Sequence, residues 1–245
     1  MKTLSVSLFN RVDYTRTVLN SLNNCFDIDN YKIFICCEPG NKEVISLAQN
    51  FRPIQTTVIV NPTRLGCNKN IYQCWNIGFK NNDFHIHIED DTVPAKDFLV
   101  YCEYCRHAYK NNYEIFSISG YVNSNNPIEQ FVSQNNYYSL ISKRNWFTPW
   151  GWATWSDRWL DIKIGFEQIS NSTTVSWDVL VHKILKDRVE IFPLVSRIQN
   201  IGAENGSFCP GSEWHQKNQY NEYWIENSKR YEENFQECSI DVSRK

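Results

Sequence analysis

The sequence lacks the long apolar runs that mark membrane-spanning helices. No stretch approaches the roughly 20 residues that such a helix needs, and residues 1–10 lack the apolar core and the cleavage site of a signal peptide. An excess of one charge is lacking too, since 25 Lys and Arg oppose 27 Asp and Glu. We therefore expect no transmembrane segment, a cytoplasmic location and no general affinity for nucleic acid.

Paired cysteine motifs are scarce, although the chain has nine cysteines. The number is odd and most of these residues lie inside apolar runs, which favours reduced, packed thiols. Cys102 and Cys105 have the spacing of a metal or redox motif, but no second pair accompanies them. We expect both side chains to pack in the core.

Short apolar runs alternate with helical patterns along the first 120 residues. Strands are expected at 4–9, 33–37, 56–60, 84–88 and 115–119, and helices at 14–22, 44–48, 68–79 and 95–109. Repeated units of this kind are typical of a mostly parallel sheet with helices on both faces. Further on, the pattern indicates strands at 137–141 and 189–192 and a helix at 177–185. No linker or internal repeat divides the chain, so one α/β domain over residues 1–245 is expected.

Three consecutive carboxylates, Glu89, Asp90 and Asp91, follow the strand expected at residues 84–88. In an open α/β sheet, ligands bind at the carboxyl ends of the strands. Like charges this close repel each other, and a divalent cation relieves the repulsion. Oxygen ligands favour Mg²⁺ or Mn²⁺, which often bind substrate phosphates as well. The alternative is a solvated acidic loop before the helix expected at residues 95–109.

Five of the nine tryptophans fall within fourteen residues. Indole faces suit the apolar surface of a sugar ring, and the Gly, Pro and Thr among them disfavour a regular helix or core strand. We interpret Trp150, Gly151 and Trp152 as part of a pocket wall. A hydrophobic core plug is the alternative, and we expect structural packing for Trp155 and Trp159.

Other motifs lie close to the expected strand ends or open expected helices. Arg11 follows the first strand, Glu38 follows the second, and Arg-Leu-Gly-Cys-Asn-Lys-Asn at residues 64–70 opens a helix. In this order, and together with the acidic triplet, they resemble the inverting GT-A glycosyltransferases, represented by N-acetylglucosaminyltransferase I and by family 2-like enzymes. The resemblance covers roughly residues 4–214. It implies a GT-A fold with residues 1–120 as the nucleotide-binding half and 121–245 as the sugar- and acceptor-binding half.

The resemblance implies a role for each matching residue. Asp91 corresponds to the ligand of Mn²⁺ (or Mg²⁺), while Asp90 and Glu89 correspond to contacts with the ribose and the donor sugar. Arg11 matches a contact with the diphosphate, and Glu38 a contact with uracil. The other matching positions are Arg64 and Asn68 on the nucleotide, and Trp150, Gly151, Trp152 and Trp177 on the sugar.

Asp178, next to Trp177, matches the position of the family's catalytic base. In an inverting transfer the acceptor hydroxyl loses its proton as it attacks, and a positioned carboxylate can accept that proton. The alternative is a first-turn acid that the helix dipole favours, and both roles are compatible. Residues 197–208 resemble the loop that closes over the donor, and the polar candidates in and after it are Asn200, Ser207 and His215.

The sequence therefore predicts a metal-dependent inverting glycosyltransferase, of the hexosyl- or pentosyltransferase class. It would move a sugar from a UDP-sugar to a hydroxyl of a glycan or lipid-linked saccharide, in polysaccharide biosynthesis. Two alternatives remain open. A sugar nucleotidyltransferase would need a Gly-rich phosphate loop after the first strand, which residues 8–13 lack. A non-catalytic glycan-binding module would not need the acidic triplet.

Overall fold

The computed structural model describes residues 2–53, 55–123, 138–185, 187–206, 208, 211–218 and 228–239. The strands are β1 (Lys2–Leu8), β2 (Tyr31–Cys37), β3 (Thr56–Val60), β4 (Phe84–Glu89), β5 (Thr92–Pro94), β6 (Ile115–Ser119), β7 (Leu140–Arg144), β8 (Trp152–Trp155), β9 (Val189–Pro193), β10 (Ile198–Asn200) and β11 (Gln236–Glu237). The helices are α1 (Val12–Asn23), α2 (Lys42–Gln49), α3 (Cys67–Gly78), α4 (Phe98–Tyr109), α6 (Ser156–Ile169), α7 (Trp177–Leu185) and α8 (Ser212–Asn218), with a 3₁₀ turn at Ile28–Asn30.

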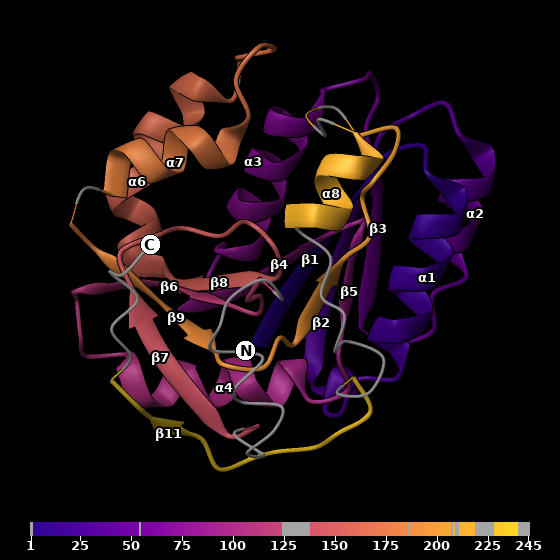
Figure 1. Ribbon diagram of the computed structural model, residues 1–245. Coiled ribbons are helices and arrows are strands. Elements are labelled where there is room, and N and C mark those ends of the chain that lie inside the picture. The colour runs from indigo at the N-terminus through magenta and orange to yellow at the C-terminus, as the bar shows by residue number, and fades with distance from the viewer. Residues whose placement is uncertain are drawn as a thin grey trace.

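One large sheet dominates the structure. Among the described residues it has nine strands in the order β11-β7-β9-β6-β8-β4-β1-β2-β3 (Figure 1). Strands β4, β1, β2 and β3 are parallel neighbours, so their carboxyl ends meet at one edge, whereas β8 runs antiparallel to β4 and β6. The mixed, mostly parallel sheet expected from the sequence is confirmed.

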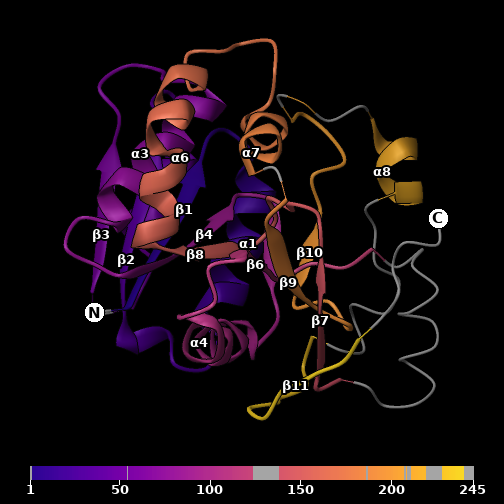
Figure 2. The same cartoon turned by 90° about the vertical axis from the view of Figure 1, so that its left-hand side faces the viewer.

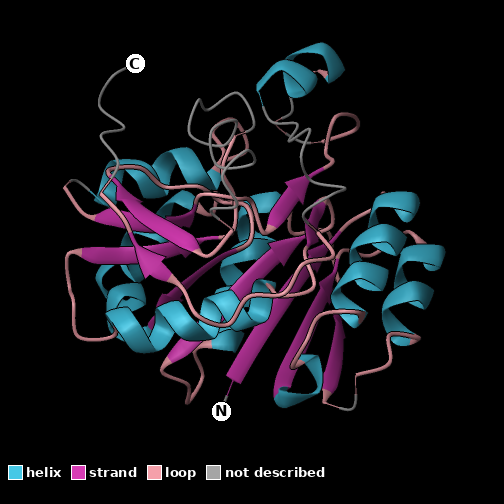
Figure 3. Cartoon of the chain, turned by 60° about the horizontal axis from the view of Figure 1, so that its bottom comes forward, coloured by secondary structure: helices cyan, strands magenta, loops and turns pink. Residues whose placement is uncertain are grey.

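Helices cover both faces of this sheet (Figure 3). Apolar residues of α1, α2 and α4 pack with the sheet on one face. Helices α3, α6 and α7 pack on the other face around a largely aromatic core, and α3 and α6 lie side by side (Figure 2). The central strands β1, β2 and β4 are buried on both sides, which explains the continuous apolar run of β2.

The expectation that the tryptophan segment forms no core strand was wrong. Residues 152–155 are β8, a fully buried strand between β4 and β6. Trp152 packs in the aromatic core and Trp155 in the core of the opposite face, because side chains three apart on a strand point to opposite sides. A strand with partners on both edges and helices on both faces accommodates large apolar side chains on each side.

Several polar side chains and thiols are buried in the core. His85 and His87 on β4 are buried, and Ser5 Oγ lies 2.8 Å from a ring nitrogen of each. Cys102 and Cys105 are buried in α4, and none of the cysteines in the described ranges forms a disulfide. No described helix is long and apolar enough to cross a membrane.

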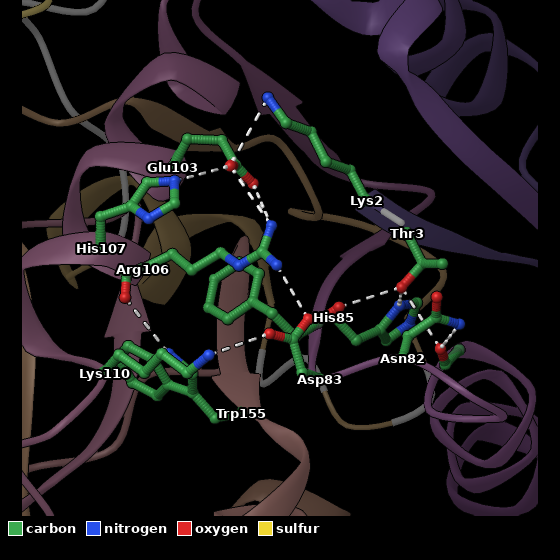
Figure 4. A network of polar contacts seen from close by, with 12 residues as sticks. Lys2, Thr3, Asn82, Asp83, His85, Glu103, Arg106, His107, Lys110 and Trp155 are labelled. Atoms are coloured by element: carbon green, nitrogen blue, oxygen red, sulfur yellow. Dashed lines mark hydrogen bonds and ion pairs between the residues drawn. The ribbon is translucent and has the colours of Figure 1, made fainter.

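A polar network holds the amino end of β4 (Figure 4). Arg106 of α4 donates to Asp83, which precedes β4, at 2.8 Å and contacts Glu103 on its own helix at 3.3 Å. The backbone carbonyl of Arg106 accepts a hydrogen bond from the indole of Trp155 at 3.3 Å. The strand is thereby fixed at the end opposite to its acidic triplet.

Candidate active site

A cavity of about 490 Å³ opens at the edge where β1, β2 and β4 end. This volume lies in the range of roughly 300–1,000 Å³ that is usual for small-molecule sites. The first half of the chain contributes Arg11, Glu38, Arg64, Glu89, Asp90 and Asp91. The second half contributes Trp150, Trp177, Asp178, Asn200, Gly202 and Trp214, among others. The resemblance assigned roles to twelve residues, and nine of them thus line one cavity.

Arg11 links the end of β1 to the acidic triplet. Its Nη2 contacts Asp90 Oδ1 and lies 2.9 Å from Asp91 Oδ2. Burial alone would lower the pKa of Arg11, but Asp91 and Asp90 raise it above its ordinary value, so the guanidinium stays charged. Its Nη1 is buried and has no hydrogen-bond partner among the described residues. A buried, unpaired donor that lines a cavity is suited to an anionic ligand.

Glu89, Asp90 and Asp91 lie together in the cavity lining, with Arg11 beside them. Burial raises the pKa of Glu89 well above its ordinary value, and Asp91, Asp90 and Asp178 add to the shift. Burial also raises the pKa of Asp90, against the lowering effect of Arg11. Carboxylates in such surroundings favour a bound cation.

The short β5–β10 pair brings a second segment against Asp91. Asn200 is opposite Thr92 in this pair, and the N–H of Ile201 donates to the backbone carbonyl of Asp91 at 2.8 Å. Gly202 packs so tightly there that an added Cβ would lie 2.2 Å from Asp91 Oδ2. The first part of the segment expected to be a closing loop is therefore a fixed strand, β10.

His215 of α8 contacts the end of β10. Its Nε2 is 3.1 Å from Asn200 Oδ1, and its buried Nδ1 has no partner in the described part of the chain. No group of three His, Cys, Asp or Glu side chains is arranged as a metal site within the described residues. A divalent ion would fit here only if substrate phosphates completed the oxygen set, which is the common arrangement for Mg²⁺. Asp91 fits the role of protein ligand, and His215, whose pKa Asp91 affects, is a candidate for a second one.

The side of the cavity where the sequence predicts the nucleotide lies at the ends of β1 and β2. Glu38 is buried, and its carboxylate accepts hydrogen bonds from the N–H groups of Leu65 at 2.9 Å and Gly66 at 2.8 Å. Gly66 has φ +83, a conformation that favours glycine. Arg64 stacks over the ring of Phe9 with its guanidinium carbon 4.4 Å from the ring centroid. Glu38 therefore shapes the loop that carries Arg64.

Asp178 lies in the first turn of α7 and lines the cavity from the other half of the chain. It is close enough to the triplet for its charge to contribute to the raised pKa of Glu89. Its Oδ1 is buried without a hydrogen-bond partner among the described residues. An unpaired carboxylate oxygen in a cavity is available to a substrate hydroxyl.

Two residues of the expected sugar-binding wall do not line the cavity. Trp152 is fully buried, with its ring centroid 3.8 Å from that of Trp75, so the core-plug alternative is correct for this residue. Gly151 has φ +58, and its carbonyl accepts a hydrogen bond from the N–H of Gly120. An added Cβ there would lie 2.3 Å from Ile198, which explains the glycine. Both positions are structural.

Trp150 and Trp177 do line the cavity, to different extents. Trp150 is half-buried and packs edge-on against Tyr121, with ring centroids 4.7 Å apart. Trp177 is only 2% exposed and its indole stacks in the aromatic core on Trp152 and Phe166. Trp150 thus remains the main aromatic surface of the predicted wall.

Asn68 is the third predicted residue that does not line the cavity. It is buried at the start of α3, and both its amide groups bind backbone groups of residues 172–177. The expectation of a nucleotide contact at Asn68 was wrong, because its hydrogen-bonding groups are turned toward the other half of the chain.

Sequence reasoning missed two aromatic residues of the cavity, Phe208 and Trp214. They are 38% and 44% exposed, which is unusual for such large side chains. Aromatic residues in a Gly-rich polar segment were the available signal. Ser207, another polar candidate, lies outside the described residues.

Comparison with known proteins agrees with this architecture. No family model and no curated protein matches the chain. Among solved structures, it is similar to S. aureus TarS 1-349 (TM-score 0.56, 11% identity, 81% of this chain and 59% of that one). It is also similar to the mannosyltransferase PcManGT from Pyrobaculum calidifontis, solved in complex with GDP-Man and Mn²⁺ (TM-score 0.51, 14% identity, 79% of this chain and 55% of that one). The chain thus has the GT-A fold of these structures and spans less than two thirds of their length.

Proposed function

We propose that this chain is a metal-dependent glycosyltransferase that uses a nucleotide-diphosphate sugar as donor. The observation that carries the proposal is that two sets of charged residues lie on opposite sides of one cavity. Arg11 and the acidic triplet lie at the ends of β1 and β4, and Asp178 faces them from α7. The mannosyltransferase with the same fold was solved with GDP-Man and Mn²⁺.

The donor would lie with its diphosphate at Arg11 and its nucleoside toward Glu38 and Arg64. Arg11 Nη1 would bind a phosphate oxygen, since it has no other partner among the described residues. We infer a UDP-sugar from the resemblance of Glu38 and its neighbourhood to N-acetylglucosaminyltransferase I. On this assignment residues 1–120 bind the nucleotide, and residues 121–245 bind the sugar and the acceptor.

The chemistry requires a base on one side of the sugar and charge neutralisation on the other. A bound Mn²⁺ or Mg²⁺, held by Asp91 and the diphosphate, would stabilise the leaving group. Asp178 would accept the proton of the acceptor hydroxyl. The hydroxyl oxygen would attack the anomeric carbon on the face opposite to the leaving diphosphate, which inverts the configuration. Trp150, Phe208 and Trp214 would pack against sugar rings at the mouth of the cavity. The acceptor would be a glycan or lipid-linked saccharide, in a cytoplasmic step of polysaccharide biosynthesis.

Calorimetry with UDP and with GDP, each with and without Mn²⁺, tests the first step. We expect UDP to bind tightly only with Mn²⁺. A glycan-binding module would show no metal-dependent nucleotide binding, and a preference for GDP would overturn the uridine assignment. Metal-dependent hydrolysis across a panel of nucleotide sugars would then identify the donor. Formation of nucleotide sugar from a sugar phosphate and UTP would indicate the nucleotidyltransferase alternative instead.

A further inference from the structure

The amide of Asn68 bridges α3 and the segment that leads into α7. Its Nδ2 donates to the carbonyls of Ser172 at 2.8 Å and Val175 at 2.9 Å. Its Oδ1 accepts from the N–H of Trp177 at 3.0 Å. The side chain of Asn68 is 3% exposed, so water does not compete for these bonds.

The third of these bonds satisfies a backbone N–H at the start of a helix. The first N–H groups of a helix have no partner within the helix. Trp177 is the first residue of α7, and its N–H is satisfied by Asn68 from another helix. Asp178 is the next residue along, so the first turn that carries its carboxylate is held directly by Asn68.

The segment before α7 is also part of the cavity. Thr174, Val175 and Ser176 all line it. Asn68 therefore determines how this wall and Asp178 are placed relative to α3, whose first residue, Cys67, lines the cavity as well.

We infer that Asn68 is a positioning residue for the proposed base Asp178. This rests on the proposed function, in which Asp178 accepts the acceptor's proton. Proton transfer needs hydrogen-bond distance between base and hydroxyl, and a misplacement of about 1 Å can cost on the order of 10²-fold in rate. The amide acts through the backbone of residues 172–177 and does not line the cavity.

Asn68→Asp is the most direct variant. It keeps the volume and an acceptor for the N–H of Trp177, but it turns oxygen lone pairs toward the carbonyls of Ser172 and Val175. We expect turnover to fall about 10- to 100-fold. The affinity for UDP–Mn²⁺ should change less than about twofold, because the main proposed contacts to UDP and Mn²⁺ lie at the ends of β1, β2 and β4. Asn68→Ala, which removes the bonds without adding repulsion, provides a second variant if the first does not fold. UDP–Mn²⁺ binding reports that each variant is folded.

The matched control is Asn61→Ala. Like Asn68, Asn61 is a buried asparagine that does not line the cavity, but its amide binds Asn70 at 2.9 Å and Gln73 at 2.8 Å instead of the segment before α7. We expect a comparable fall in melting temperature for Asn61→Ala and Asn68→Ala, with near-normal turnover only for Asn61→Ala. Equal loss of turnover in both variants would mean that removing any buried amide near α3 lowers activity. That result would overturn the inference.

A double-mutant cycle with Asp178→Asn gives the decisive readout. Residues that act as one unit are not additive. If Asn68 acts through Asp178, Asn68→Asp should lower turnover less than about twofold in the Asp178→Asn background. The same factor in both backgrounds would overturn the inference and leave the proposed function intact. Near-normal turnover of Asp178→Asn alone would instead remove Asp178 as the base, and with it this role for Asn68.

Discussion

Arg11 Nη2 lies 2.9 Å from Asp91 Oδ2, and the same nitrogen also contacts Asp90. One guanidinium, placed just after β1, therefore organises the carboxylates that follow β4. Parallel neighbours make this possible, because β1 and β4 end at the same edge of the sheet. The arrangement predicts that the nucleotide site depends on residues 80 positions apart in the chain, and the following substitutions test its parts.

Asp91→Ala should remove the protein's main contact to the metal without disturbing the fold, because the residue follows a strand end and is not in the core. We expect UDP affinity in Mn²⁺ to fall by more than the roughly 10- to 100-fold seen for residues that only support a ligand. Calorimetry with and without EDTA measures this, and EDTA should have little further effect on the variant. Asp161→Ala, at an exposed ion pair with Arg188, serves as the control. Unchanged UDP–Mn²⁺ binding in Asp91→Ala would show that the metal assignment is wrong.

Gly202→Ala should also weaken UDP binding in Mn²⁺, but less than Asp91→Ala does, because it acts only by steric displacement of Asp91. The added Cβ would lie 2.2 Å from Asp91 Oδ2, so the carboxylate has to move. We expect weaker UDP binding with Mn²⁺ and little change without it, and the metal-free titration serves as the internal control. If both titrations weaken equally, the substitution has distorted the nucleotide site more widely.

Trp152→Ala and Trp150→Ala should separate core from cavity. Trp152 is fully buried, so its truncation should lower the free energy of unfolding by about 3–5 kcal/mol. Trp150 is half-buried at the cavity, so its truncation should weaken binding of the UDP-sugar more than that of UDP. Chemical denaturation and calorimetry measure the two effects. The reverse pattern would return Trp152 to the sugar-binding wall.

Asp178→Asn should separate chemistry from donor binding. Asparagine has nearly the same size but cannot accept a proton at neutral pH, and loss of a general base typically costs about 10²–10⁴ in rate. In the proposed arrangement residues of the other half hold the donor, so UDP–Mn²⁺ affinity should be preserved. Steady-state turnover with the acceptor, alongside calorimetry, measures both quantities, and normal turnover would exclude Asp178 as the base.

Stability should fall in mild acid because of the buried histidines. Burial lowers the pKa of His87 to about 3, and that of His85 well below its ordinary value. In the unfolded chain both would titrate near 6.5, so the unfolded state binds more protons as pH falls below about 6.5. The free energy of unfolding should then drop by about 1.4 kcal/mol per pH unit and per histidine, until the folded-state pKa is reached.

His87→Gln isolates this contribution. Glutamine can bond to the neighbouring hydroxyl of Ser5 but does not titrate. Denaturant unfolding of both proteins at pH 7 and pH 5 should show a smaller loss for the variant, by about 2 kcal/mol. Identical pH dependence in the two proteins would mean that His87 is already accessible to protons in the folded state.

The alternating pattern of the first 120 residues was sufficient to predict the parallel part of the sheet. Every strand and helix expected there from local periodicity is present, and β3 and β6 have the expected bounds. The helix expected from residue 95 begins only at Phe98, because residues 92–94 form β5 and pair with β10. That pairing joins segments about a hundred residues apart, and no local pattern records it.

The sequence by itself determined that acids would collect at a strand end, since a buried apolar run followed by Glu89, Asp90 and Asp91 has only one placement in a parallel sheet. It also determined that α7 would begin with Trp177 and Asp178. Only the tertiary structure decided which tryptophan faces the cavity and which is buried, and that Asn68 binds the backbone before Asp178. Those outcomes depend on which surfaces meet across the sheet, where burial and hydrogen-bond satisfaction override the character of the residue alone.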